Sequence, residues 1–257
     1  MIQTVIPCGG KGTRISGGNP DVNKGLVEIG GRPILWHVMR IFAAYGYKDF
    51  ILALGHRGDL IRRYFIEYER MNRDVSFRLG EPDSPSFIGD NQESDWQVTL
   101  IDTGIEPTKG ERLRQVAPHL TGERFFLTYN DGVADIDMDA LLRFHLSHGK
   151  QVTVTGYQPV YQYGIVEPDA GGRVTAYHQY PRMDHWINAG FMVIERAALA
   201  QLEPGMDLET GFLVRMAEQG QLMLYRHDGF WRSMDTFKEA QELNEFWESG
   251  RAPWKVW

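Results

Sequence analysis

Apolar runs of strand length and amphipathic helical patterns alternate through the first half of the chain. Thr4–Pro7 is a short apolar run within Ile2–Cys8, and from Pro33 onward apolar residues recur at helical spacing. The same pair repeats as a strand pattern at Asp49–Leu54 and a helical pattern at Asp59–Tyr68. Strands and helices that alternate in this way form a mostly parallel sheet covered by helices. The chain is therefore expected to adopt a Rossmann-like α/β fold around a mixed, mostly parallel sheet.

Further strands and helices are expected along the rest of the 257 residues. The apolar run Arg124–Tyr129 ends in Asn130-Asp131-Gly132, and open α/β sheets bind ligands at such strand ends. Ser84–Glu93 is rich in Pro, Ser, Gly and Asp and has no apolar period, so a mobile or partner-contacting loop is expected there. Beyond residue 150 the patterns favour strands, which predicts a small β-rich portion. The other expected elements are strands at Trp96–Ile101, Val152–Tyr157, Gly164–Glu167, Val174–Tyr177 and Asn188–Glu195, and helices at Arg112–Ala117, at Met138–His148 and from Thr236 to Gly250.

Composition excludes several classes of protein. With 42% hydrophobic and 24% charged residues, the chain has the balance of an ordinary globular protein. Its formal net charge of -7 argues against a nucleic-acid partner, which would need clustered cations. The first apolar run is too short to span a membrane and lacks the basic flank of a secretory signal, so a cytoplasmic protein without a membrane partner is expected. The single cysteine, Cys8, excludes an internal disulfide.

The first strand leads directly into a glycine-rich loop, Gly9-Gly10-Lys11-Gly12-Thr13-Arg14. Glycines let the backbone approach a phosphate closely and present N–H donors to it. The loop is not a P-loop, because Gly12 stands where Ser or Thr should follow the lysine, and Ile15 stands where the dinucleotide fingerprint has its third glycine. The lysine and arginine of the loop, together with Lys24, supply positive charge. A phosphate-bearing ligand is therefore expected here rather than a simple turn.

The loop is followed by Lys24 and Val27-Glu28-Ile29-Gly30-Gly31, and this combination resembles the signature of the sugar-1-phosphate nucleotidyltransferases. Within that family, the likeness is strongest to the cytidylyltransferases that use glucose 1-phosphate. The resemblance spans nearly the whole chain. It continues in order through Pro33-Ile34-Leu35-Trp36-His37, Val98-Thr99-Leu100-Ile101-Asp102-Thr103-Gly104, Asp131-Gly132-Val133-Ala134-Asp135, Gly229-Phe230-Trp231, Met234-Asp235-Thr236 and Ala252-Pro253-Trp254-Lys255.

The resemblance implies an enzyme that joins CTP to a phosphorylated small-molecule acceptor with the help of Mg2+ and releases pyrophosphate. It implies one domain, with a nucleotide-binding half (1–135), an acceptor-binding half (136–235) and a C-terminal helix and tail (236–257), assembled as a homo-oligomer. Hard Mg2+ prefers oxygen ligands, which suits a pair of aspartates. The implied site residues are Arg14 and Lys24 for catalysis; Gly9, Gly10, Lys11, Gly12, Thr13, Arg14, Thr103, Arg112 and Asn130 for the nucleotide; Tyr129, Gln179, Tyr180 and Asn188 for the acceptor; and Asp131 and Asp235 for the metal.

The acceptor site departs from the family's pattern. The family's Glu-Lys-Pro appears here as Gln179-Tyr180-Pro181, which replaces a phosphate-binding lysine by a neutral hydroxyl. Loss of such a charge-assisted contact costs about 1.5 to 3 kcal/mol unless another cation, such as Arg182, replaces it. The segment around the retained lysine, Val22-Asn23-Lys24-Gly25, also lacks the family's prolines. A cytidylyltransferase for a different phosphorylated or phosphonate acceptor therefore remains an alternative.

Other interpretations also remain open. Asp131 before a glycine is typical of a turn as well, and Asp235 suits the cap of the last helix. A non-catalytic nucleotide-binding module would keep the same fold, and a related glycosyltransferase would use Asp135-Ile136-Asp137 as its metal motif. His145 and His148 have i, i+3 spacing without an evident third ligand, which favours a solvated helix face over a zinc site.

Overall fold

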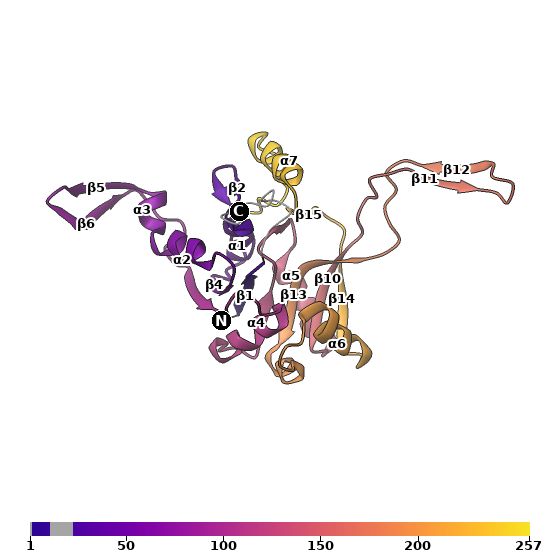
Figure 1. Cartoon of the computed structure of the whole chain (residues 1–257), viewed down its shortest axis with the longest axis horizontal. Coiled ribbons are helices and arrows are strands. Elements are labelled where there is room, and N and C mark those ends of the chain that lie inside the picture. The colour runs from indigo at the N-terminus through magenta and orange to yellow at the C-terminus, as the bar shows by residue number, and fades with distance from the viewer. Residues whose placement is uncertain (1, 11–22) are drawn as a thin grey trace.

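A seven-stranded sheet forms the centre of the protein in a computed structural model (Figure 1). The structure describes residues 2–10 and 23–257. The sheet contains β1 (Gln3–Cys8), β4 (Asp49–Leu54), β7 (Gln97–Asp102), β8 (Arg124–Leu127), β10 (Val152–Tyr157), β13 (Ile187–Glu195) and β14 (Leu222–His227), in the order β14-β10-β13-β8-β1-β4-β7. Four of its pairings, β1 with β4, β1 with β8, β4 with β7 and β10 with β14, are parallel, whereas β13 is antiparallel to both neighbours. The expected mixed, mostly parallel sheet is confirmed.

Helices cover both faces of this sheet, so the side chains of each central strand point alternately into two apolar cores. In β1, Ile6 and Cys8 face one core and Val5 faces the other, and all six residues are buried. A parallel strand that is covered on both sides has no solvent face, which explains its continuous apolar run. Among the described residues, no helix is both long and apolar enough to cross a membrane. The helices are α1 (Ile34–Ala44), α2 (Gly58–Ile66), α3 (Tyr68–Asn72), α4 (Lys109–Val116), α5 (Met138–His148), α6 (Val214–Glu218) and α7 (Phe237–Glu248), with the 3-10 helices η1 (Lys24–Leu26), η2 (Ala117–His119) and η3 (Arg196–Gln201) and the π-helix η4 (Leu208–Leu213).

Two antiparallel hairpins project from opposite sides of the body (Figure 1). We name them the first arm, β5 (Asp74–Arg78) with β6 (Glu81–Ile88), and the second arm, β11 (Ile165–Pro168) with β12 (Val174–His178). Every residue of β5 is exposed, and most of β11 and β12 is exposed as well. Two smaller pairs lie on the body, β2 (Glu28–Ile29) with β3 (Arg32–Pro33) and β9 (Gly132–Ala134) with β15 (Trp231–Ser233).

The first arm corrects one expectation. Ser84–Glu93 was expected to be a mobile or partner-contacting loop, but its first five residues belong to the strand β6. A strand whose partner is exposed along its whole length need not carry the alternating apolar pattern that reveals a strand on a core. The edge strand β14 was also not expected, and it is only partly buried. By contrast, the expected strand at Asp49–Leu54 and the expected helix at Met138–His148 coincide with β4 and α5.

The two histidines near the end of α5 correct another expectation. His145 does not lie on a solvated face, because it is buried with Nδ1 2.8 Å from the hydroxyl of Thr153 and Nε2 3.0 Å from a carboxylate oxygen of Glu195. The i, i+3 spacing had not shown which helix face meets the sheet. Among the described residues, no group of three or more His, Cys, Asp or Glu side chains is placed to hold a metal ion.

The C-terminal tail packs against α1 through a buried histidine. Nε2 of His37 donates to the carbonyl oxygen of Ile29 at 2.8 Å, and the indole N–H of Trp254 donates to Nδ1 of His37 at 3.3 Å. Trp254 is completely buried, and Trp247 of α7 lies edge-on to the imidazole with its ring centroid 4.7 Å away. The tail is therefore tied to the hairpin that follows η1.

Candidate active site

A cavity of about 520 Å³ opens at the carboxyl ends of β1 and β8. The residues that follow these two strands, Gly9-Gly10 and Tyr129-Asn130-Asp131, form part of its lining. Open α/β sheets bind their ligands at this edge, as the sequence had indicated. The described lining residues are Pro7, Gly9, Gly10, Lys24, Lys109, Arg112, Tyr129, Asn130, Asp131, Gly132, Ala189, Trp231, Ser233 and Asp235.

Lys24 lies between two aspartates of the cavity. Its Nζ donates to Oδ2 of Asp131 at 2.5 Å and to Oδ1 of Asp235 at 2.8 Å. Burial disfavours the ammonium's charge, but the two carboxylates outweigh it and raise the pKa of Lys24 above its usual value. The two aspartates are 107 and 211 positions from Lys24 in the sequence, so the fold alone brings these three charges together.

The backbone on either side of Lys24 is held by Asn23. The side-chain oxygen of Asn23 caps η1 by accepting the N–H of Gly25 at 2.9 Å, and its amide nitrogen donates to the carbonyl of His56 at 3.0 Å. Asn23 is almost completely buried. A buried side chain with both polar ends satisfied fixes the start of η1 and hence the origin of the Lys24 side chain.

The two aspartates are positioned by a small strand pair and a helix cap. β9 and β15 pair directly after Asp131 and before Asp235, and the N–H of Met234 donates to the carbonyl of Asp131 at 2.9 Å. Thr236 and Glu239 form a capping box at the start of α7, and Glu239 also accepts the N–H of Asp235 at 2.7 Å. Thr236 is thus the helix cap, and the alternative that gave this role to Asp235 is wrong.

Arg112 lies against Gly9 with its guanidinium buried. A Cβ at Gly9 would lie 2.1 Å from Cζ of Arg112, so the close approach of loop and arginine requires glycine there. Burial lowers the pKa of Arg112, although an arginine remains charged. Thr103, which accepts one of the hydrogen bonds from Arg112, lies outside the cavity lining, and its hydroxyl donates to the carbonyl oxygen of Leu54. The terminal nitrogens of Arg112 donate at 2.6 to 3.2 Å to four oxygens, the hydroxyl of Thr103 and the carbonyls of Leu54, Gly104 and Ile105.

Tyr129 forms a wall of the cavity. Its hydroxyl donates to Oε1 of Glu209 at 2.6 Å and accepts from the amide nitrogen of Asn188 at 3.3 Å. The ammonium of Lys109 forms an ion pair with Glu209 and lies 4.9 Å from the centre of the Tyr129 ring. Burial, followed by the contact with Glu209, raises the pKa of Tyr129 well above its usual range, so the phenol stays protonated. Gly190 has a φ of +88°, and a Cβ there would lie 2.6 Å from the ring of Tyr129.

Comparison with known proteins decides the family. The chain matches the family described as Nucleotidyl transferase over residues 3–249. It belongs to the nucleotidyl transferase family. The glucose-1-phosphate cytidylyltransferases of Salmonella typhi and Salmonella typhimurium are each 39% identical to it over 259 residues that cover the whole of both chains. The crystal structure of HddC from Yersinia pseudotuberculosis has the same fold, with a TM-score of 0.70 at 18% identity over 96% of this chain and 100% of that one.

Among the residues that the structure describes, most of those assigned from the resemblance meet in this nucleotidyl transferase cavity. Asn188 touches the cavity wall through Tyr129, and Thr103 supports it through Arg112. Lys11, Gly12, Thr13 and Arg14 lie outside the described residues. Those in the lining are Gly9, Gly10, Lys24, Arg112, Tyr129, Asn130, Asp131 and Asp235.

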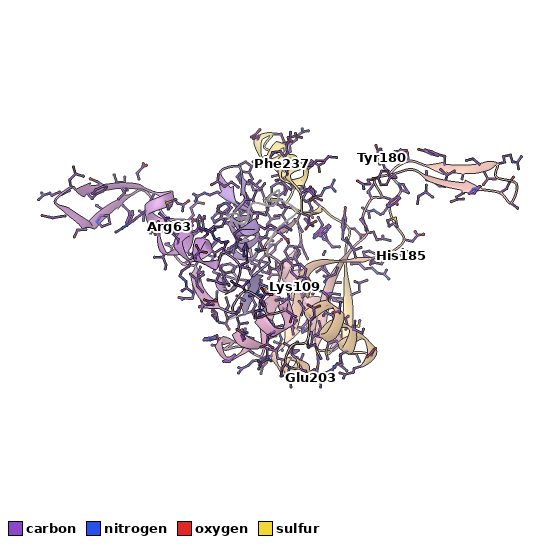
Figure 2. The ribbon with its side chains drawn as sticks, in the orientation of Figure 1. Arg63, Lys109, Tyr180, His185, Glu203 and Phe237 are labelled. Atoms are coloured by element: carbon purple, nitrogen blue, oxygen red, sulfur yellow. The ribbon has the colours of Figure 1, made fainter. Side chains whose placement is uncertain are left out.

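Gln179 and Tyr180 do not join the cavity of their own chain. They follow β12 on the second arm, in the segment between β10 and β13 that leaves the sheet (Figure 1). Figure 2 shows Tyr180 beside that arm and Lys109 in the body. The side chain of Gln179 accepts a hydrogen bond from Tyr177 at 2.7 Å, and Tyr180 is 61% exposed. The expected acceptor residues thus separate into two groups. Tyr129 and Asn188 lie at the cavity, whereas Gln179 and Tyr180 lie beside the second arm.

Sequence reasoning missed Lys109 and Glu209. The two residues are 100 positions apart, and neither belongs to a motif named from the sequence. One local signal was present, because Thr108 and Glu111 have the Thr-x-x-Glu spacing that begins a helix, and Thr108 does cap α4. That signal would have placed Lys109 in the first turn of a helix that was instead expected to begin at Arg112.

Proposed function

We propose that this nucleotidyl transferase is a cytidylyltransferase that joins CTP to glucose 1-phosphate and produces CDP-glucose and pyrophosphate. One observation carries the proposal: Lys24 meets Asp131 and Asp235 at the ligand-binding edge of the sheet. The chain in which they meet matches glucose-1-phosphate cytidylyltransferases over its full length. A cavity with this arrangement supports phosphoryl chemistry on a nucleotide.

The reaction requires positioning and charge neutralisation. A phosphate oxygen of the acceptor attacks the α-phosphorus of CTP, a new P–O bond forms, and pyrophosphate leaves with the electron pair of the broken bond. Gly9 and Gly10 leave the backbone open to the phosphates, and the resemblance assigns Lys11, Gly12, Thr13 and Arg14 to the same phosphates. Lys24 neutralises charge at the reacting phosphorus, while Asn130 lines the same part of the cavity.

Asp131 and Asp235 fit a magnesium ion. Both carboxylates converge on one positive group, the ammonium of Lys24, so their oxygens lie within reach of a single small cation. Mg2+ prefers oxygen ligands and commonly binds through one or two carboxylates, with substrate phosphates and water completing its shell. When bound, such an ion neutralises the charge of the triphosphate. The positions of the two aspartates support this role.

The acceptor side of the cavity is proposed to include Tyr129 and Asn188, whose hydroxyl and amide already contact one another. Gln179 and Tyr180 reach no acceptor in the cavity of their own chain. Their departure from the family's Glu-Lys motif favours one alternative, a cytidylyltransferase for another phosphorylated or phosphonate acceptor. This alternative keeps the nucleotide, the metal and the chemistry and changes only the second substrate.

A pyrophosphate-release assay tests the proposal. The purified protein is incubated with Mg2+, with CTP, UTP, GTP or dTTP, and with a panel of sugar 1-phosphates, other phosphate esters and phosphonates. The expected result is release that requires CTP and is fastest with glucose 1-phosphate. Faster turnover of another acceptor would overturn the glucose 1-phosphate assignment, and release with no combination would favour the non-catalytic module.

We also propose that the protein is a homo-oligomer. The two arms carry large apolar side chains that are about half exposed or more, among them Phe77, Ile88, Val166 and Tyr177. Such side chains on opposite projections would become buried if copies packed through their arms. Light scattering coupled to size exclusion measures the mass directly, and a monomer at micromolar concentration would contradict this proposal.

A further inference from the structure

Three cations among the described residues line the cavity, and two of them are heavily committed to partners. Arg112 is buried and donates to four protein oxygens. Lys24 spans two carboxylates. Lys109 forms one ion pair, with Glu209, and its side chain is 45% exposed. An ammonium has three N–H donors, so Lys109 can donate further hydrogen bonds to a ligand in the cavity.

Contacts of the first turn of α4 fix the position of Lys109 opposite Glu209. Thr108, which caps α4, also donates its hydroxyl to the carbonyl of Met206 at 2.9 Å. Gly110 packs so closely on the same carbonyl that a Cβ there would lie 2.3 Å from it. The first turn of α4 is therefore fixed against the segment that begins η4, and Glu209 is the second residue of η4.

The neighbours of Lys109 belong to the acceptor side of the cavity. Its ammonium lies over the ring of Tyr129, and the hydroxyl of Tyr129 contacts both Glu209 and Asn188. The acceptor brings a phosphate to this region, and Gln179 and Tyr180 supply no cation there. A buried or half-buried phosphate needs a charge-assisted contact, which a lysine provides as a point charge.

Resting on the proposed function, we propose that Lys109 binds the phosphate of the acceptor and thereby replaces the lysine that Tyr180 lacks. In the ligand-free protein, Glu209 holds the ammonium in place beside Tyr129. The acceptor's phosphate competes with Glu209 for the same ammonium. Lys109 is thus a specificity-determining residue for an acceptor that carries a dianionic group.

The kinetic test compares Lys109→Met and Lys109→Arg with the wild type. Lys238→Met is the matched control, because Lys238 lies on α7 with its side chain 85% exposed. Lys109→Met is expected to raise the KM for glucose 1-phosphate about tenfold to a hundredfold and to leave the KM for CTP unchanged, because one charge-assisted contact is lost. Lys109→Arg is expected to retain most of the acceptor affinity. An unchanged acceptor KM, or a rise in the KM for CTP instead, would overturn the inference.

Calorimetry with inorganic phosphate separates this inference from the proposed function, because it needs no turnover. Lys109→Met is expected to weaken phosphate binding at least tenfold, and Glu209→Gln to strengthen it, since that variant removes the competing charge but keeps an oxygen for Tyr129. If the wild type turns over no acceptor, the proposed function fails, and the titration still decides the role of Lys109. Equal phosphate affinity in the wild type and Lys109→Met, or no measurable binding to either, would refute that role. If Lys109→Met does not fold, the phosphate affinities of Glu209→Gln and Lys109→Arg are compared with that of the wild type instead.

Discussion

Acid should loosen the attachment of the C-terminal tail, because that attachment depends on a neutral imidazole. His37 donates through Nε2 to Ile29 and accepts the indole N–H of Trp254 at Nδ1. A protonated ring has a hydrogen on both nitrogens, so Nδ1 would then face the indole donor with a donor of its own. Burial is the main cause that lowers the pKa of His37 from 6.5 to about 4.

The magnitude follows from the two pKa values. Because the folded pKa lies below the unfolded one, the stabilisation is complete above about pH 6.5 and is lost progressively as the pH falls toward the folded pKa. Each pH unit within this window costs about 1.36 kcal/mol, so about 2 kcal/mol of the free energy of unfolding is lost by about pH 5. Water does not screen this effect, because His37 has no exposed surface.

Urea unfolding at about pH 7.5 and about pH 5 measures this loss in the wild type and in His37→Gln. Glutamine offers a donor and an acceptor at similar positions and does not titrate, so the variant should lose about 2 kcal/mol less on acidification. Histidines near α5 and the carboxylates titrate in both proteins and cancel in the comparison. His185→Gln is the control, because His185 lies exposed beside the second arm (Figure 2) and should behave like the wild type. An equal acid loss in His37→Gln and the wild type would refute the neutral imidazole.

Two further predictions concern the cavity. Asp131→Asn and Asp235→Asn should each lower nucleotidyl transfer at least about a hundredfold in the pyrophosphate assay, because each removes one anionic oxygen ligand of the proposed metal; unchanged turnover in either variant would contradict the metal assignment. Gly190→Ala should destabilise the fold by about 1 to 3 kcal/mol in urea, because Gly190 has a positive φ and its new Cβ would collide with Tyr129. The alanine variant should also raise the KM for the acceptor more than that for CTP, whereas Gly149→Ala, at a positive φ with open space around it, should leave both KM values unchanged.

The parts of the fold that pack on both sides were predictable from the sequence. β1 and β4 are buried along nearly their whole length, so their apolar runs reported the sheet directly. The strands of the second arm, although mostly exposed, were predicted at Gly164–Glu167 and Val174–Tyr177, whereas no strand was expected in the first arm. The strand in 84–88 was missed because its segment is rich in Pro, Ser, Gly and Asp and has no apolar period.

Site residues that belong to sequence motifs were predictable, whereas site residues that come together only through the fold were not. Asp131 and Asp235 were assigned from separate motifs, and the structure brings them to one lysine. Lys109 and Glu209 belong to no motif and meet through the packing of α4 on η4. For Gln179 and Tyr180, the motif position was recognised, but the path of the chain through the second arm decides where they lie. Local sequence does not encode that path.

The closing of the tail on α1 has a consequence for protein synthesis. Trp254 packs in the same core as Ile6, and Asp235 meets Lys24 across more than two hundred positions. A nascent chain held by the ribosome before residue 235 has emerged lacks one of the two carboxylates, and before residue 254 it lacks the indole partner of His37. The nucleotide cavity therefore matures after translation of nearly all of these residues. Premature termination within α7 would keep Lys24, Asp131 and Asp235 but remove Trp254, and should therefore lower the stability of the core around His37.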